Sequence, residues 1–377
     1  MEGKRTLLVM VKTNPHDHVM WKLRFRELRE LAKSAGYRVV GEVVQTRLKE
    51  TVNYVVGRGK LEEIKNLVED ASVDTVIFYN VLSSKQKYNL ERELKRRVID
   101  RYELTLEIFE KAATDKLAKL QIELARIKKV FPYFKLQARL KYLREHPGFK
   151  SAGEYAYHNK ITFLRRRMRR IIEEIERERA IRLKQLERRR ELGIPVVCVV
   201  GYYNSGKTTL FNALTGLNKP VSNKPFTTLS SKYYVYGNPH ASFFLVDTIG
   251  FVLDLDPRLI SSFRINLDDM KEADLLLLVA DISESDELVT LKISTSLEIL
   301  RELVGVPEEK IMVVLNKCDL LPGEELKRKL ERLTPLIEPF GYVVVSAKKR
   351  KNLNSLVEAI VERLRVSSGL KWKVFVS

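Results

Sequence analysis

The chain has 377 residues, of which 45% are apolar and 31% are charged, so it can bury sizeable cores and is not a wholly disordered polypeptide. This length points to two or three domains. Its two cysteines, Cys198 and Cys318, lie in separate apolar runs, which excludes a disulfide framework and a cysteine-based zinc site. No run reaches the ~18 apolar residues of a spanning helix. The N-terminal segment has no signal-peptide pattern, so we expect a cytoplasmic protein without a membrane span.

The net charge of +19 is distributed unevenly along the chain. Residues 1–200 contain 45 Lys and Arg against 27 Asp and Glu, a net of +18, whereas residues 201–377 contain 23 against 22, a net of +1. Solubility alone gives little reason for such a division. The pattern indicates a first half that binds a polyanion and a nearly neutral second half with a different task.

Strand and helix patterns alternate over the first hundred residues. They predict strands at 4–12, 37–45, 52–56, 75–78 and 98–100, and helices at 21–35, 60–69 and 83–97. This alternation predicts a small α/β lobe over residues 1–103. The segment Gly57-Arg58-Gly59-Lys60 resembles a phosphate loop, but it is too short for a P-loop, and a turn followed by a helix start is the simpler interpretation.

A helical period replaces this alternation from residue 103 onward. Apolar residues recur every three or four positions over 103–131 with no Gly or Pro before Pro132, which predicts one long helix. A second stretch of this kind covers 160–192. We expect the two helices to pack as an antiparallel hairpin over 104–192, joined by a mobile linker. Gly193-Ile194-Pro195 then marks a domain boundary.

Strands and helices alternate again beyond this boundary. Strands are predicted at 196–200, 233–236, 243–246, 274–281, 311–315 and 342–345, and helices at 207–214, 289–303, 324–333 and 352–364. The second half is therefore predicted to be a Rossmann-like α/β domain over 193–366. A strand-like tail follows at 367–377.

The segment Gly201-Tyr-Tyr-Asn-Ser-Gly206-Lys207-Thr208 follows a predicted strand and opens a predicted helix, as the G-x-x-x-x-G-K-[ST] P-loop requires. Its glycines let successive backbone N–H groups face phosphate oxygens. We expect Lys207 to reach the β- and γ-phosphates and the Thr208 hydroxyl to bind Mg²⁺. The predicted nucleotide contacts here are Gly201, Asn204, Ser205, Gly206, Lys207, Thr208 and Thr209.

Three further motifs come at the ends of predicted strands. In Asp247-Thr-Ile-Gly250, the carboxylate can hold Mg²⁺ and the glycine N–H can meet the γ-phosphate. In Asn316-Lys317-Cys-Asp319, Asp319 can accept the two hydrogen bonds that guanine donates and adenine does not, Asn316 can bridge the base to the P-loop, and Lys317 can cover one face of the ring. A backbone N–H of Ser346-Ala347-Lys348 can meet the guanine O6. Four motifs in this order at the ligand-binding edge of an open sheet predict a GTPase that uses GTP, GDP and Mg²⁺.

The first switch is predicted between the P-loop and the D-x-x-G motif, in KPFTTLS. Thr227 and Thr228 compete there for the role of the threonine that senses Mg²⁺ and the γ-phosphate, and we favour Thr228. The predicted metal ligands are then Thr208, Thr228 and Asp247, and the predicted catalytic residues are Lys207, Thr228 and Gly250. Residues 250–264 form the predicted second switch.

The residue that follows D-x-x-G is Phe251, where Ras-like enzymes place a glutamine that orients the attacking water. A phenyl ring cannot orient water. We therefore expect intrinsic hydrolysis to be slow and to be completed by a partner, another residue or a bound cation.

Together these motifs resemble the HflX family of translation-factor-class GTPases. The similar segments are GYYNSGKTTLFNALTG, PFTTLSSK, DTIGFV and NKCD and, in the first half, VGRGKLEEI, VIDRYELTLEIFEKAA and KLQIELARIK, so the resemblance covers roughly residues 5–365. It implies a two-lobed N-terminal domain with a long helical hairpin, followed by a G domain. It also implies binding to the large ribosomal subunit and GTP hydrolysis that the ribosome stimulates. Bacterial members of the family separate ribosomes into subunits.

The chain departs from the family pattern in two places. Tyr203 stands where the family usually has a threonine beside the γ-phosphate, and a bulky ring there can slow hydrolysis or move the cation site. The glycine-rich G-P-G-E-T linker is replaced by SAGEY at 151–155. Asn204, by contrast, matches the family and resembles the asparagine that binds K⁺ in cation-dependent relatives, so stimulation by K⁺ is a hypothesis.

Arginines crowd the second predicted helix of the hairpin. Residues 160–190 carry 13 basic and 5 acidic residues, an excess available to RNA phosphates, although a solvated helix face is the other interpretation. The candidate RNA contacts are Arg165, Arg166, Arg167, Arg169, Arg170, Arg188, Arg189 and Arg190.

From these observations we expect a monomer that binds the large ribosomal subunit through its rRNA. It would couple GTP binding and hydrolysis to ribosome association or to subunit splitting. The alternative is a GTP-gated RNA-binding or RNA-remodelling protein that does not act on assembled ribosomes.

Overall fold

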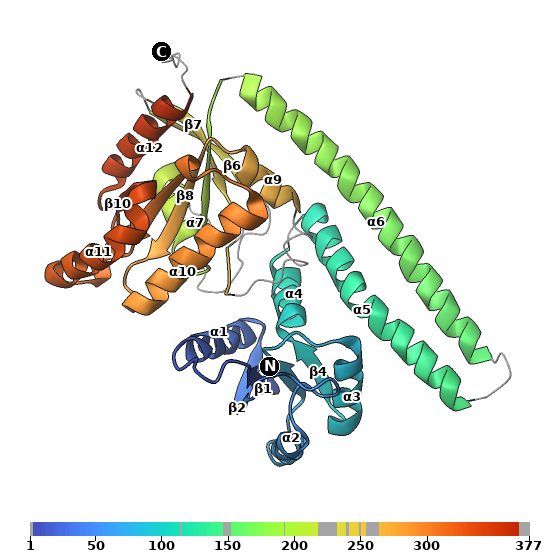
Figure 1. The fold of residues 1–377 in the computed structure, drawn as a ribbon. Helices are drawn as coiled ribbons and strands as arrows, with labels where there is room; N and C mark the ends of the chain where they lie inside the picture. The colour runs from blue at the N-terminus through green and yellow to red at the C-terminus, as the bar shows by residue number, and fades with distance from the viewer. Residues whose placement is uncertain are drawn as a thin grey trace. The chain divides into compact units, whose positions relative to one another are not determined.

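The computed structural model describes residues 3–113, 115–145, 152–191, 193–217, 232–238, 241–248, 250–253 and 264–368 (Figure 1). The chain divides into two compact units: unit 1 is Met1–Lys111 with Lys119–Arg177, and unit 2 is Ala112–Ala118 with Glu178–Ser377. Both candidate switch threonines, Thr227 and Thr228, lie outside the described residues. So do most of the second switch and most of the predicted tail.

Unit 1 contains a four-stranded sheet in the order β2-β1-β3-β4, in which every neighbouring pair is parallel. Its elements are β1 (Lys4–Lys12), α1 (Met20–Ser34), β2 (Tyr37–Thr46), α2 (Arg58–Asp70), β3 (Thr75–Phe78), α3 (Ser84–Leu94), β4 (Arg97–Asp100) and α4 (Arg101–Ala112), with most of α5 (Lys116–Glu145) and the first part of α6 (Ala152–Glu191). The predicted α/β lobe with a helical hairpin is confirmed.

The predicted strand at 52–56 is wrong. Thr51 and Val55 form only an isolated bridge across a tight turn. Val55 adopts a left-handed φ of 68°, which a β-branched residue rarely takes and which cannot continue a strand. Directly afterwards α2 begins at Arg58, so the Gly57–Lys60 segment is a turn and a helix start.

The single helix predicted over 103–131 is two helices, because α4 ends at Ala112 and α5 begins at Lys116. Asp115 explains the new start, because its Oδ1 accepts the Ala118 N–H at 2.7 Å, a side-chain bond of the kind that begins helices. The apolar period continues across the break and hides it in the sequence. Pro132 lies inside α5 instead of ending it, so much of the predicted linker is helical.

The helices α5 and α6 run side by side as a hairpin (Figure 1). Leu120, Leu124 and Ile127 of α5 pack against Ile171 of α6 in one small apolar cluster. Arg167 of α6 adds a bidentate ion pair to Glu123 of α5, with both N–O distances 2.7 Å. The apolar seam leaves the remaining faces of α6 to its many charged residues.

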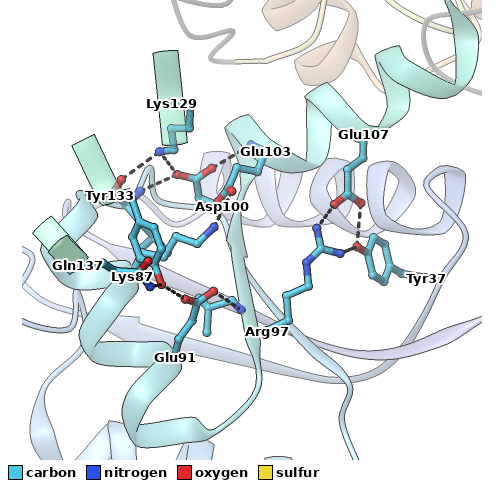
Figure 2. A network of polar contacts seen from close by, with 12 residues as sticks. Tyr37, Lys87, Glu91, Arg97, Asp100, Glu103, Glu107, Lys129, Tyr133 and Gln137 are labelled. Carbon is cyan, nitrogen blue, oxygen red and sulfur yellow. Dashed lines mark hydrogen bonds and ion pairs between the residues drawn. The ribbon is translucent and has the colours of Figure 1, made fainter. Parts of the chain in front are cut away.

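A buried polar network fastens α5 to the α/β lobe (Figure 2). The Asp100 carboxylate, which is fully buried, accepts the N–H groups of Leu82 and Glu103 at 2.8 and 2.9 Å and also pairs with Lys129 of α5. Lys129 Nζ donates in addition to the Leu82 carbonyl at 3.0 Å. Burial, followed by the neighbouring Asp100 charge, raises the pKa of Glu103, whose other neighbour is Lys87.

Replacing Lys129 with Met is expected to destabilise unit 1 by about 2–4 kcal/mol, because it leaves the Asp100 charge buried with only its backbone donors. The measurement is guanidinium unfolding of the full chain in a Trp372→Phe background, where Trp21 of α1 is the sole tryptophan and reports on unit 1. The matched control is Arg126→Met. It breaks the exposed ion pair with Glu110, and we expect a loss of less than about 1 kcal/mol. Equal losses in the two variants would contradict the prediction.

Unit 2 contains a six-stranded sheet in the order β10-β9-β8-β5-β7-β6, parallel except for the β6–β7 pair. Its strands are β5 (Val196–Gly201), β6 (Lys232–Asn238), β7 (Ala241–Asp247), β8 (Leu275–Asp281), β9 (Ile311–Asn316) and β10 (Tyr342–Val344). Its helices are α7 (Lys207–Thr215), α9 (Arg264–Glu272), α10 (Asp286–Glu298), η1 (Ile299–Val304), η2 (Glu308–Lys310), η3 (Cys318–Leu320), α11 (Gly323–Ile337), η4 (Glu338–Phe340) and α12 (Leu353–Ser368).

The central strand β5 shows how this sheet is covered on both faces. Val196, Cys198 and Val200 belong to one apolar core, which also contains α10 and α11 side chains. Val197 and Val199 belong to a second core, formed with α7 and α12. Because alternate residues of a strand point to opposite faces, a strand with two buried faces is apolar throughout. The predicted Rossmann-like α/β fold of the second half is confirmed. Within the described ranges, no helix is long and apolar enough to cross a membrane.

Candidate functional site

The four predicted motifs follow the strands β5, β7, β9 and β10. These strands are parallel, so their carboxyl ends lie at one edge of the sheet. The strand β5 has β8 on one side and β7 on the other, so the chain order reverses next to the P-loop. Such a reversal at the carboxyl edge is where open α/β sheets bind ligands.

The two P-loop glycines are required by close backbone contacts. A Cβ atom on Gly201 would lie 2.3 Å from the Val279 carbonyl oxygen of β8, and one on Gly206 would lie 2.2 Å from Asn316 Nδ2. Both residues also have a left-handed φ, of 135° and 92°. The loop therefore packs closely against Val279 of β8 and Asn316 of β9. The helix α7 begins immediately after the loop, so its first N–H groups face the loop.

Lys207, the first residue of α7, is buried. Its Nζ donates to the Tyr202 carbonyl at 2.6 Å, which folds the side chain back over the loop. Burial lowers the pKa of Lys207 to about 8, with a further lowering by Lys292 that the Asp247 carboxylate opposes. A cation held with so little solvent is well suited to receive an anionic ligand.

The side chains of Thr208, at the end of the P-loop motif, and Asp247, at the end of β7, lie next to each other. Thr208 Oγ1 lies 3.5 Å from Asp247 Oδ2, and the carboxylate is buried at the end of β7. A hydroxyl and one carboxylate fit Mg²⁺, which completes its octahedron with water and phosphate oxygens instead of a protein cage. The described part of the chain has no group of three or more His, Cys, Asp or Glu residues that could hold a metal. The third predicted ligand, Thr228, is outside the described residues.

Gly250 lies against the P-loop. A Cβ atom there would be 2.9 Å from Lys207 Nζ and 3.3 Å from Tyr203 Cα, so a side chain at position 250 would displace the Lys207 ammonium and crowd the Tyr203 backbone. The next residue, Phe251, donates its N–H to the Gly201 carbonyl at 2.9 Å and accepts the Tyr203 N–H at 3.0 Å. Its ring is buried in the apolar core of unit 2. Position 251 therefore supports the loop and presents no group to a water molecule.

The base-recognition motifs are tied together by Asn316. Its Nδ2 donates to the Ser205 carbonyl at 2.9 Å, and its Oδ1 accepts the Ala347 N–H at 3.0 Å, so one side chain joins the P-loop to the loop after β10. Ser346 Oγ donates to Asp319 Oδ1 at 2.5 Å, which orients an otherwise exposed carboxylate. The remaining predicted contacts differ in exposure: Asn204 and Lys348 are exposed, Thr209 is half-buried, and Ser205 is buried.

Two acidic residues beside the site were missed in the sequence. Asp281, the last residue of β8, pairs with Lys317 at 2.5 Å and accepts Ser283 Oγ at 2.6 Å. Its place at the carboxyl end of a strand was the signal that could have identified it. Glu284 forms an ion pair with Lys292 of α10 close to the P-loop. No sequence pattern predicts that contact.

The predicted RNA contacts on α6 are not equivalent. Arg165, Arg166, Arg169 and Arg170 are exposed, whereas Arg167 is engaged with Glu123. The Arg165 guanidinium lies 5.8 Å from the centre of the Phe131 ring, a cation–π distance. Arg188 is exposed in unit 2, and the side chains of Arg189 and Arg190 are outside the described set.

Comparisons with known proteins agree with this arrangement. A family model described as a GTP-binding GTPase N-terminal domain matches residues 22–110, and one described as a 50S ribosome-binding GTPase matches residues 196–317. The GTPase HflX of Thermofilum pendens is 40% identical over 351 residues, covering 91% of this chain and 81% of the relative. The GTPase HflX of Thermococcus kodakarensis is 38% identical over 343 residues, covering 90% and 77%. Among solved structures, the SsGBP complex with GDP is 31% identical with a TM-score of 0.54, covering 98% of this chain and 100% of that one.

Proposed function

Because the chain belongs to the HflX family of GTPases, we propose that it binds the large ribosomal subunit through α6 and couples its nucleotide state to ribosome association or subunit splitting. It hydrolyses GTP to GDP and phosphate. The observation that carries the proposal is the row of exposed arginines on α6, Arg165, Arg166, Arg169 and Arg170, in the half of the chain that holds nearly all the positive charge. Phosphate contacts of this kind give affinity for RNA of any sequence.

Residues of the P-loop and of the motifs after β7 and β9 form the proposed nucleotide site. Lys207 binds the β- and γ-phosphates, Gly250 meets the γ-phosphate, and Asp319 accepts the guanine N1–H and 2-amino hydrogens. A relative has been crystallised with GDP, which supports the same ligand here. Thr208 and Asp247 would hold Mg²⁺, which neutralises charge on the transferred phosphoryl group when it is bound. Thr228 remains the proposed third ligand, and K⁺ at Asn204 remains a hypothesis.

The ribosome is the proposed source of the group that position 251 lacks. Because the Phe251 ring is buried in the core, this chain has no side chain there to orient the attacking water. Slow hydrolysis by the free protein and faster hydrolysis on the ribosome follow from that difference. With hydrolysis delayed in this way, the protein would release the ribosomal subunit only after binding to it.

The test is co-sedimentation with purified large subunits in a non-hydrolysable GTP analogue and in GDP. We expect binding in the analogue that decreases in GDP and falls steeply with salt. The double variant Arg169→Glu/Arg170→Glu should lose most of this binding, while Arg328→Glu, an exposed arginine on α11, should keep it. Complete competition by free RNA would instead favour an RNA-binding protein that does not act on assembled ribosomes.

A further inference from the structure

Lys292 of α10 lies directly behind the P-loop. Its Nζ is 5.6 Å from the centre of the Tyr202 ring and 5.8 Å from that of Tyr203, both within the range of a cation–π interaction. The two rings are themselves neighbours, with their centres 6.5 Å apart. Tyr202, Ser205, Glu284 and Lys292 line one small cavity of about 10 Å³, so α10 and the loop face each other across very little space.

The Lys292 ammonium is held in place by Glu284. Both carboxylate oxygens of Glu284 lie 2.6 Å from Nζ, and the two side chains are only 12% and 21% exposed. The backbone of Glu284 is fixed in turn, since its carbonyl accepts from the buried Lys329 of α11, which also donates to the Ile282 carbonyl at 3.2 Å. An ion pair with so little exposure and such anchoring keeps one geometry, unlike a solvated surface pair.

Tyr203 also contacts Gly250 and Phe251, the segment in which Gly250 is proposed to meet the γ-phosphate. Its N–H donates to the Phe251 carbonyl at 3.0 Å, and its Cα would touch any side chain placed on Gly250. The Tyr203 ring is half-buried and bulky. If this ring were not held, it would be free to occupy space over Gly250, where a phosphate oxygen has to fit.

We propose that Lys292, oriented by Glu284, is a positioning residue of the GTPase that holds Tyr202 and Tyr203 of the P-loop in place during hydrolysis. The observed contacts of the Lys292 ammonium are with Glu284 and the two tyrosine rings. The lysine acts by keeping the aromatic pair against α10, so that Gly250 stays open to the γ-phosphate. Because the Tyr203 backbone lies directly against Gly250, holding its large ring on α10 keeps the ring compatible with turnover.

The experiment measures GTP turnover by the free protein, without ribosomes, for Lys292→Met and Lys292→Arg. We expect the Met variant, which keeps the aliphatic stem, to lower kcat about three- to tenfold while KM and the Kd for GDP change less than about twofold. The Arg variant, which can still pair with Glu284 and cover both rings, should restore most of the lost rate. Lys327→Met, an exposed lysine on α11, is the matched control and should turn over GTP as the unsubstituted chain does.

A double-mutant cycle with Tyr203→Thr separates positioning from a general loss of structure. In the Tyr203→Thr background no ring remains to be held at that position, so the effect of Lys292→Met on kcat should shrink to less than about twofold. The variant Glu284→Gln/Lys292→Met avoids an unpaired buried carboxylate and should show the same loss of kcat as Lys292→Met alone. An unchanged kcat in Lys292→Met, or an equal loss with and without Tyr203, would overturn the proposal.

This inference rests on the proposed binding of phosphate at the P-loop, and the two can fail separately. Lys207→Met tests the P-loop itself and should lower kcat/KM for GTP by about three orders of magnitude. If Lys207→Met hydrolyses GTP normally, the P-loop assignment is wrong. If Lys207→Met is inactive while Lys292→Met has an unchanged kcat, only the role of Lys292 is rejected.

Discussion

Replacing Asp319 with Asn is expected to weaken GTP and GDP binding about 100-fold or more and to let xanthine nucleotides bind in their place. The carboxylate accepts two guanine hydrogens, whereas the Asn amide presents its own N–H₂ to one of them. Xanthine carries a carbonyl where guanine has its 2-amino group, so it can accept that amide hydrogen. The effect is large because guanine bound to the Asn variant would leave a hydrogen-bond donor of the base without an acceptor.

The measurement is the Kd of fluorescent GDP and XDP for the Asp319→Asn variant and the unsubstituted chain. Because Ser346 Oγ donates to Asp319, the amide oxygen of the variant can still accept from Ser346 and its nitrogen then faces the base. Glu324→Gln, which neutralises an exposed carboxylate on α11, is the control and should bind GDP normally. An Asp319→Asn variant that keeps its preference for GDP would place the guanine elsewhere.

The second large effect is expected from removing the charge of Lys207. Lys207→Met should lower kcat/KM for GTP by about three orders of magnitude, because the site loses its buried cation beside the phosphates. Since burial lowers the pKa of this lysine to about 8, nucleotide binding should also weaken at alkaline pH. The free protein loses the Lys207 proton as the pH rises through that value, and binding phosphate then requires its uptake.

The protonation of Lys207 links pH to both nucleotide affinity and folding stability. Between about pH 7 and about pH 9 the affinity for GDP should fall about tenfold, since the charged form changes from dominant to minor. The free energy of unfolding of the nucleotide-free protein should instead rise with pH over this range. The reason is that the buried Lys207, whose pKa is lowered, destabilises the fold less once it is neutral. Titrations of GDP affinity across this range are the test. A decrease of the same size in Lys207→Met would assign the pH dependence to another group.

The local motifs were predictable because their chemistry depends on residues adjacent in the chain. A P-loop needs two glycines and a lysine at set spacings after a strand, and the structure shows why, since a Cβ at Gly201 or Gly206 would meet β8 or Asn316. Short apolar runs likewise predicted the strands of both sheets. The prediction failed where a single residue outweighed the pattern, as with the Asp115 cap that divides α4 from α5 and the left-handed Val55.

The contacts between distant residues were not predictable, because nothing in the spacing of residues shows which side chains the fold brings together. Asn316 links Ser205 to Ala347, and Lys129 reaches the buried Asp100, over separations that carry no periodic signal. Lys292 is one lysine among many in the sequence. Only the packing of α10 behind the P-loop makes it a neighbour of Tyr202 and Tyr203.

The charge of the chain shows the same division. By itself the sequence determined that almost all of the +19 belongs to the first half and that a guanine-nucleotide site occupies the second. The tertiary structure decided which charges face solvent: Arg169 and Arg170 are exposed on α6, while Arg167 and Lys129 are held in ion pairs. The physical reason is that net charge is a sum over residues, whereas the charge available to a partner depends on burial and pairing, which exist only in the folded chain.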